Sequence, residues 1–258
     1  MPGTARFITI PLLNFSVLLS RLAVPCIAIF LAPARAQQPA SVLVAAAADL
    51  ARTQPSLSES FAKATGRQVH FTFGGSGMLA RQIEQGAPFD VFLSANQQFV
   101  ENLTVAGRIQ PGSARVYAQG RLALWSRSGK FRSLADLTNP KLLHLAIANP
   151  AHAPYGAAAQ ELLRRKGLWD GLAGKVVYGE NVRQALQFAE TGNADAVITA
   201  WSLVFDKGGI LLPADSHTPI RQMGAVVQDT RNPQAAAAFL QFLAGPEGRK
   251  VLRRFGFD

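Results

Sequence analysis

The sequence predicts an α/β fold with two Rossmann-like lobes, each built on a mainly parallel sheet, around a cleft. The first observation is that short apolar strands alternate with helical segments along nearly the whole chain. This alternation is typical of parallel sheets that are covered by helices on both faces. The second is that the pattern forms two blocks of about a hundred residues or fewer. The third is that small polar turns follow several strands, and open α/β sheets bind ligands at the carboxyl ends of their strands.

The first block alternates three strands with three helices. The strands are predicted at 41–48, 68–73 and 90–95, and the helices at 50–66, from residue 76 onward, and at 97–107. A later strand at 223–228 is expected to return the chain to this block, where helices at 232–245 and 247–256 close it. We therefore predict that residues 37–117 and 219–258 form lobe 1 and residues 118–218 form lobe 2.

The second block has the same alternation. Its strands are predicted at 120–127, 143–149, 175–179 and 194–200, with helices at 134–137, 155–167 and 182–192. Gly167 is a typical stop for the long helix before it, because glycine tolerates the left-handed conformation that ends many helices.

The N-terminal segment is typical of a signal peptide, predicted at residues 1–36. Arg6 precedes an apolar run, and Ala34 and Ala36 occupy the positions of a small-residue cleavage site, so the mature chain would begin at Gln37. A membrane anchor is the alternative, but Arg21 divides the apolar run into pieces too short to span a bilayer easily. We therefore expect export and a periplasmic location.

The single cysteine, Cys26, lies in that segment, so the mature protein would have no thiol and no disulfide. The formal net charge is +10, and removal of the three arginines of residues 1–36 leaves +7. The basic residues are spread thinly and do not alternate with aromatic ones, so no nucleic-acid partner is expected. An attraction for small anions and a neutral basic surface both remain open.

Four strand-to-helix junctions are the candidate ligand positions. They lie around Ala48 and Asp49, at Ser76, around Tyr155 and Gly156, and around Asn181 and Val182. The first N–H groups of a helix have no intrahelical partner and lie at the positive end of its dipole, which suits an anion. Ser76 lies in a glycine-rich turn without the lysine of a phosphate-binding P-loop, so no nucleotide is indicated.

Each junction also has a purely structural interpretation. Asp49 is a typical helix cap, Ser76 suits a glycine-rich turn, Tyr155 suits a helix start, and Val182 suits the core. The four together, in an exported two-lobed chain, favour a binding cleft more than any one does.

Two other chemistries are less well supported. His152 and His217 have no partner at the spacing of metal ligands, so we expect them to be exposed loop residues. A secreted hydrolase with Ser76 as its nucleophile is the other alternative. The residues around Ser76 do not form a nucleophile elbow, and no His–Asp pair accompanies it.

Four motifs make the chain resemble the periplasmic molybdate-binding proteins of ABC transporters. They are GSGMLARQIEQGAPFDVFLSAN at 75–96, ANPAHAPYG at 148–156, ENVRQAL at 180–186 and FLQFLAGPEGRKVLRRFGF at 239–257. The resemblance extends from Val42 to Phe257. It implies the two-lobed type II periplasmic-binding-protein fold, which closes on a bare tetrahedral oxyanion, molybdate or tungstate.

The resemblance also implies the binding residues. The family's donor at the end of the first strand falls on Asp49, with Ala48 beside it; its loop serine falls on Ser76, its residue after proline on Tyr155, and its helix-start valine on Val182. The family has Ser or Asn where this chain has Asp49, and an ionised aspartate only accepts hydrogen bonds. We therefore expect Asp49 to present its backbone N–H and to turn its carboxylate away, as a helix cap.

The resemblance implies molybdate held by Asp49, Ser76, Tyr155 and Val182, with no direct cation ligand and no cofactor. The tyrosine that some members place in the cleft falls on Ala200, which is followed by Trp201. The implied protein is a monomeric, non-enzymatic, extracytoplasmic solute-binding protein that delivers the anion to a membrane ABC permease. Sulfate, phosphate or another tetrahedral oxyanion remains the alternative ligand.

Overall fold

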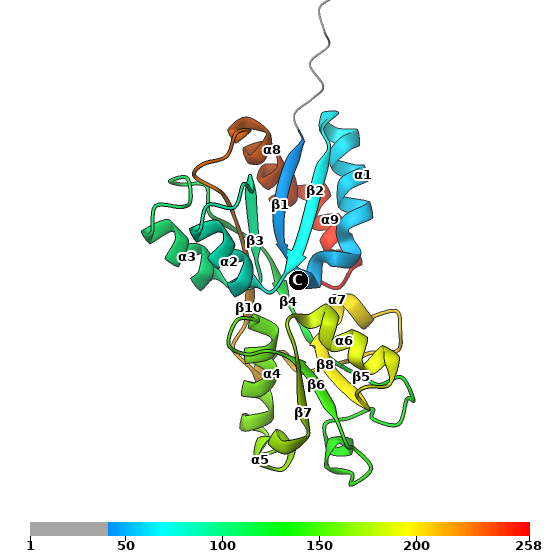
Figure 1. Cartoon of the computed structure of the whole chain (residues 1–258). Helices are drawn as coiled ribbons and strands as arrows, with labels where there is room; N and C mark the ends of the chain where they lie inside the picture. Colours follow the sequence, from blue (N-terminus) through cyan, green and yellow to red (C-terminus); the bar gives the residue numbers. More distant parts are fainter. Residues whose placement is uncertain (1–40) are drawn as a thin grey trace, which may run out of the picture. The chain divides into compact units, whose positions relative to one another are not determined.

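The computed structural model describes residues 41–258, and every structural statement below refers to them. The predicted signal peptide at 1–36, its Cys26 and the predicted start at Gln37 lie outside the described residues. Two five-stranded sheets organise the described chain, each flanked by helices (Figure 1). The predicted two-lobed α/β fold is confirmed.

The sheet of lobe 1 has the strand order β2-β1-β3-β10-β4. Its strands are β1 (Val42–Ala47), β2 (Val69–Gly74), β3 (Val91–Ser94), β4 (Arg115–Gly120) and β10 (Ile220–Val226). β1 is parallel to both β2 and β3, whereas β10 is antiparallel to β3 and β4. The helices are the 3-10 helix η1 (Ala48–Thr53), α1 (Gln54–Thr65), α2 (Ser76–Glu84), α3 (Gln97–Val105), α8 (Pro233–Ala244) and α9 (Pro246–Arg254).

The sheet of lobe 2 has the order β7-β6-β8-β5-β9. Its strands are β5 (Leu122–Trp125), β6 (Leu145–Ala148), β7 (Val176–Gly179), β8 (Ala196–Ala200) and β9 (Ile210–Leu211). β6 is parallel to β7 and β8, and β5 is antiparallel to β8 and β9. The helices are η2 (Ala135–Thr138), α4 (Pro154–Arg165), α5 (Trp169–Leu172), η3 (Ala173–Lys175), α6 (Val182–Thr191), α7 (Trp201–Val204) and η4 (Ala214–Ser216).

Strand β1 shows why lobe 1 forms a sheet covered on both faces. Val44 on one face packs in a cluster with Phe61 of α1 and Phe239 of α8. Ala45 on the other face packs in a cluster with Ile83 of α2. Because successive strand residues point to opposite faces, a strand that is apolar at every position requires helices on both sides.

The chain crosses between the sheets at two places. β4 belongs wholly to the first sheet and β5 to the second, so the first crossing lies at Arg121. The predicted division between residues 117 and 118 falls inside β4. Arg121 is fixed at this crossing by an ion pair of 3.1 Å with Asp258 near the chain end. The second crossing leads from β9 through η4 to β10.

Some elements differ from the prediction. The segment 50–66 is not one helix, because η1 precedes α1 and Pro55 lies in the first turn of α1. Proline has no N–H to donate, so it suits a helix start. The pattern did not reveal strand β4 or the short elements β9, α5, α7, η3 and η4.

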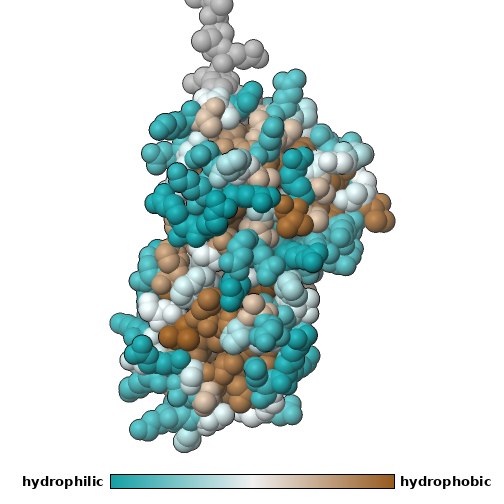
Figure 2. Space-filling view, turned by 180° about the vertical axis from the view of Figure 1, so that it is seen from behind, coloured by the Kyte–Doolittle hydropathy of each residue, from teal (hydrophilic) through white to brown (hydrophobic). Residues whose placement is uncertain are grey.

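The surface is mixed in polarity. Seen from behind, the upper lobe is largely covered by hydrophilic side chains, whereas the lower lobe carries a more continuous apolar area (Figure 2). Among residues 41–258, no helix combines the length and apolarity that a membrane span requires.

Candidate oxyanion-binding site

A small cavity is lined by the four strand-to-helix junctions, two from each lobe. All five residues that the sequence singled out line it: Ala48, Asp49, Ser76, Tyr155 and Val182. The remaining lining residues are Ala47, Gly74, Gly75, Ala95, Ala153, Pro154 and Asn181. In Figure 1, α2 lies at the lower end of the upper lobe, and α4 and α6 begin at the facing end of the lower lobe.

The Ser76 junction offers a hydroxyl and a helix start. Gly75 is extended and no side chain caps α2, so the first N–H groups of this helix are not satisfied by a cap. The Ser76 Oγ accepts a hydrogen bond of 3.0 Å from the N–H of Ala95, which leaves its own hydrogen for another acceptor. The N–H of Gly77 is engaged, because it donates to the carbonyl of His152 at 2.9 Å.

The two junctions of lobe 2 differ in capping. Tyr155 is the second residue of α4, whose start has no side-chain cap. At α6, the Asn181 side chain accepts hydrogen bonds from the N–H groups of Arg183 and Gln184 at 3.0 and 3.2 Å. Asn181 therefore satisfies the second and third N–H groups of α6 and leaves that of Val182, the first, for another acceptor.

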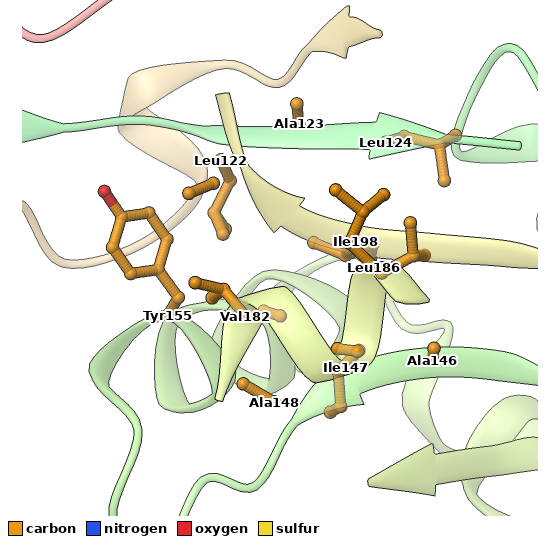
Figure 3. Close-up of a cluster of buried hydrophobic side chains, with 14 of the residues drawn as sticks. Leu122, Ala123, Leu124, Ala146, Ile147, Ala148, Tyr155, Val182, Leu186 and Ile198 are labelled. Atoms are coloured by element: carbon orange, nitrogen blue, oxygen red, sulfur yellow. The ribbon is translucent and has the colours of Figure 1, made fainter. Parts of the chain in front are cut away.

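Asp49 is the centre of a buried polar network. Its Oδ2 accepts a hydrogen bond of 2.8 Å from the Tyr155 hydroxyl and a second one from Gln222 Nε2. The Gln222 Oε1 in turn accepts from the Tyr117 hydroxyl at 2.9 Å. Tyr155 lies at the edge of the apolar core of lobe 2, beside Leu122, and its hydroxyl oxygen points away from the labelled apolar side chains (Figure 3). The network therefore links lobe 2 to lobe 1.

The prediction that the Asp49 carboxylate caps the helix is wrong. No side chain caps η1, and the carboxylate is held in the cavity wall by Tyr155 and Gln222. Asp49 is fully buried, and its Oδ1 has no hydrogen-bond partner among the described residues. The backbone N–H groups of Asp49 and Leu50 face the carboxylate closely enough to lower its pKa, yet outside hydrogen-bond geometry for Oδ1.

Burial decides the ionisation of this network. Desolvation raises the pKa of Asp49 from its ordinary 3.8 to about 6, although hydrogen bonds from Tyr155 and Gln222 lower it. Burial, and then the charge of Asp49, raise the pKa of Tyr117 and of Tyr155 well above the usual 10. Both hydroxyls are therefore protonated donors at neutral pH.

The cavity suits an anion held by neutral donors. Asp49 is the single charged residue among the described residues that line it. Within residues 41–258, no cluster of three or more His, Cys, Asp or Glu side chains suits a metal ion. Ser76 has neither a histidine nor a carboxylate among its hydrogen-bond partners in the described chain.

Comparison with known proteins identifies the family. The sequence profile of the bacterial extracellular solute-binding proteins matches residues 42–258. The chain belongs to this family. It is 37% identical over 220 residues to the molybdate-binding protein ModA of Rhodobacter capsulatus, which covers 84% of this chain and 87% of that protein. It is 38% identical over 230 residues to ModA of Azotobacter vinelandii, covering 86% and 91% of the two chains.

Solved structures agree with this assignment. The periplasmic molybdate-binding protein of Azotobacter vinelandii superposes with a TM-score of 0.80 at 31% identity, covering 84% of this chain and 98% of that one. The sulfate-binding protein SubI of Mycobacterium tuberculosis superposes with a TM-score of 0.70 at 19% identity and shows the shared fold alone.

This solute-binding protein departs from the sequence-based expectations at further positions. Ala200 is buried at the end of β8 and does not line the cavity, and Trp201 packs on Phe205 at a centroid distance of 6.3 Å. The tyrosine that lines the cavity is Tyr155, and its hydroxyl donates a hydrogen bond to Asp49. His217 is buried, and His152 lies 3.2 Å from Glu180, so neither is the exposed loop residue that was predicted.

Sequence reasoning missed Gln222 altogether, and it placed Asn181 at a junction without predicting that its side chain caps α6. Gln222 occupies an inward position of β10, between the exposed Arg221 and the half-buried Met223. A polar residue at an inward position of an apolar strand was the available signal, because buried polar groups need partners. Asn181 stands directly before α6, where asparagine is a preferred cap.

Proposed function

We propose that this solute-binding protein captures molybdate, or tungstate, in the cavity and delivers it to a membrane ABC permease. The observation that carries the proposal is the convergence of uncapped helix starts and the Ser76 hydroxyl on a cavity without a cationic side chain. Hydrogen bonds to a charged acceptor are stronger than neutral ones, so such donors can hold an oxyanion without a counter-charge.

The proposed contacts follow from the geometry of each junction. The Ser76 hydroxyl and the N–H groups of Ser76, Tyr155 and Val182 donate to the anion, and the N–H groups of Ala48 and Asp49 lie at the same cavity wall. The donors come from both lobes. Binding would therefore favour the closed arrangement over an open one.

The setting of this activity is also part of the proposal. We place the mature protein in the periplasm, after export by the predicted signal peptide at 1–36, as a monomer that carries out no chemistry itself. The two relatives compared above, which share most of the chain, are named as molybdate-binding proteins, and this supports the choice.

A four-anion stability panel tests the ligand. Purified mature protein is heated with sodium molybdate, tungstate, sulfate or phosphate, and titration calorimetry gives each dissociation constant. A ligand present at one hundred times its dissociation constant adds about 2.7 kcal/mol to the free energy of unfolding. Molybdate and tungstate should raise the melting temperature at micromolar concentration. If only sulfate or only phosphate stabilises the protein, that anion and not molybdate is the ligand.

A further inference from the structure

One oxygen of a buried carboxyl group in the cavity wall has no partner. Asp49 Oδ2 is satisfied by Tyr155 and Gln222, whereas Asp49 Oδ1 accepts no hydrogen bond from any described residue and is itself shielded from solvent. Buried polar atoms are nearly always paired, so such an atom at a ligand cavity indicates a missing partner.

The surroundings of Asp49 supply no positive charge. Across from it lie the Tyr155 hydroxyl on α4, the Gln222 amide on β10 and the Tyr117 hydroxyl on β4, all neutral. The Ser202 hydroxyl on α7 donates to the Asp49 backbone carbonyl at 2.8 Å. None of the ion pairs found within residues 41–258 involves Asp49. An ionised carboxylate here would strongly repel a dianion bound in the same cavity.

We propose that the site takes up one proton together with a dianionic oxyanion, and that Asp49 Oδ1 carries this proton and donates it to a ligand oxygen. The inference rests on the proposed function. The proton comes from solvent, and no bond of the oxyanion breaks. Oδ1 is the protonated atom because Oδ2 already accepts two hydrogen bonds. Protonation removes the repulsion and converts the unpaired acceptor into a donor.

The ionisation of the unliganded protein agrees with this. Because burial raises the pKa of Asp49 to about 6, the carboxyl group is mostly ionised at pH 7.5 before ligand arrives. Binding of a dianion must then draw in nearly one proton. The affinity should fall by up to about tenfold for each unit of pH above the pKa of the free protein.

Calorimetry on the wild-type protein tests the proton directly. Sodium molybdate is titrated at pH 7.5 in two buffers with different enthalpies of ionisation, Tris and Hepes, and the difference in heat gives the number of protons taken up. We expect a value near one. The dissociation constant should rise from pH 6.5 to pH 8.5 by on the order of 100-fold at most.

Substitution assigns the proton to Asp49. Asp49→Asn presents an amide N–H where the protonated acid would stand, so it should bind molybdate without proton uptake, with little dependence on pH, and more tightly than wild type at pH 8.5. Asp90→Asn, which changes a buried acid of lobe 1 outside the cavity, should keep the proton uptake.

A second variant separates titration from a structural role. The Tyr155 hydroxyl lowers the pKa of Asp49, so Tyr155→Phe should move the fall in affinity to higher pH. If molybdate binds without proton uptake, or if Asp49→Asn is weaker than wild type at every pH, this inference is wrong while the proposed function stands. If molybdate gives neither heat nor thermal stabilisation, both fail.

Discussion

The two lobes share one sheet plan but present different chemistry to the cavity. In each sheet, the fourth strand of the order runs antiparallel to its neighbours and follows a crossing from the other lobe. Lobe 1 brings the Asp49 carboxyl and the Ser76 hydroxyl to the cavity. In lobe 2, the Tyr155 hydroxyl is bonded to Asp49 and the Asn181 side chain caps its own helix, so this lobe is left with main-chain donors. In the proposed site, side chains of lobe 1 would therefore act on the ligand, while lobe 2 would contact it through its backbone.

Side chains of both lobes make the contacts between them. Besides the Tyr155–Asp49 bond, Arg52 of lobe 1 makes a two-pronged ion pair with Asp206 of lobe 2, and its guanidinium stacks on Phe205 at 5.2 Å. Arg52 and Asp206 are partly exposed, so this pair contributes little by itself. The Asp49–Tyr155 bond is fully buried, so removal of either partner would leave a buried polar group unpaired.

The substitution with the largest expected effect, Gly156→Ala, tests the backbone geometry of lobe 2. A Cβ added at Gly156 would overlap the main-chain carbonyl of Ala148, so Gly156→Ala must push α4 away from β6. We expect a loss of about 3 kcal/mol in the free energy of unfolding. Anion affinity should also fall sharply, because the N–H of Tyr155 moves with α4.

Urea unfolding and calorimetry measure both effects. Gly171→Ala is the control, because an added Cβ meets nothing within 4 Å there. Its stability should change by less than about 1 kcal/mol. Equal behaviour of the two variants would show that the tight approach of α4 to β6 does not matter.

The next effect tests the buried charge of lobe 1 in the absence of ligand. The folded-state pKa of Asp49 is raised from 3.8 to about 6, so the folded state binds this proton more tightly than the unfolded state. The stability that protonated Asp49 gives the folded state is fully present below about pH 4 and is lost as the pH rises through about 6. At pH 8, Asp49→Asn should therefore raise the free energy of unfolding by up to about 3 kcal/mol.

Denaturant unfolding from pH 4 to pH 8 measures this. The gain should vanish near pH 4, and Asp215→Asn, which changes an exposed acid, should give none. A gain that is equal at both ends of the pH range would point to packing rather than to charge.

A smaller effect tests the hydroxyl of lobe 1. Ser76→Ala should weaken molybdate binding by about 1.5–3 kcal/mol, or roughly ten- to a hundredfold in affinity. Stability should fall by about 1 kcal/mol as well, because the buried N–H of Ala95 loses its acceptor. Ser94→Ala, whose hydroxyl bonds Asn96 outside the cavity, should lower stability alone. Unchanged affinity in Ser76→Ala would remove the hydroxyl from the proposed contacts.

The smallest effect on affinity is expected in lobe 2. Val182→Ala removes two methyl groups from a buried side chain and should cost about 1–2 kcal/mol of stability. Because a valine can offer the anion no polar group but its N–H, the dissociation constant should change less than about threefold. A loss of affinity as large as that of Ser76→Ala would contradict the proposal that lobe 2 contacts the anion through its backbone alone.

The sequence by itself determined most of the longer elements and the junctions that line the cavity. Apolar strands and helix starts are set by residues close in the chain, so periodicity and turn residues predicted the two sheets and the junctions at Asp49, Ser76, Tyr155 and Val182. The start of α1 was misjudged because Pro55 shortens the helix, a local effect that the broad pattern hid.

Only the tertiary structure decided what the Asp49 carboxylate contacts. Its partners are remote in the chain, with Tyr155 106 positions away and Gln222 173 positions away. No local pattern encodes such pairs, because the Gln222 contact forms only when the sheet of lobe 1 has assembled and the Tyr155 contact only when the two lobes meet. Local propensity assigns the Asp49 carboxylate to a helix cap, but the Tyr155 hydroxyl and the Gln222 amide donate hydrogen bonds to it instead. A buried charged group is destabilised unless such donors are present.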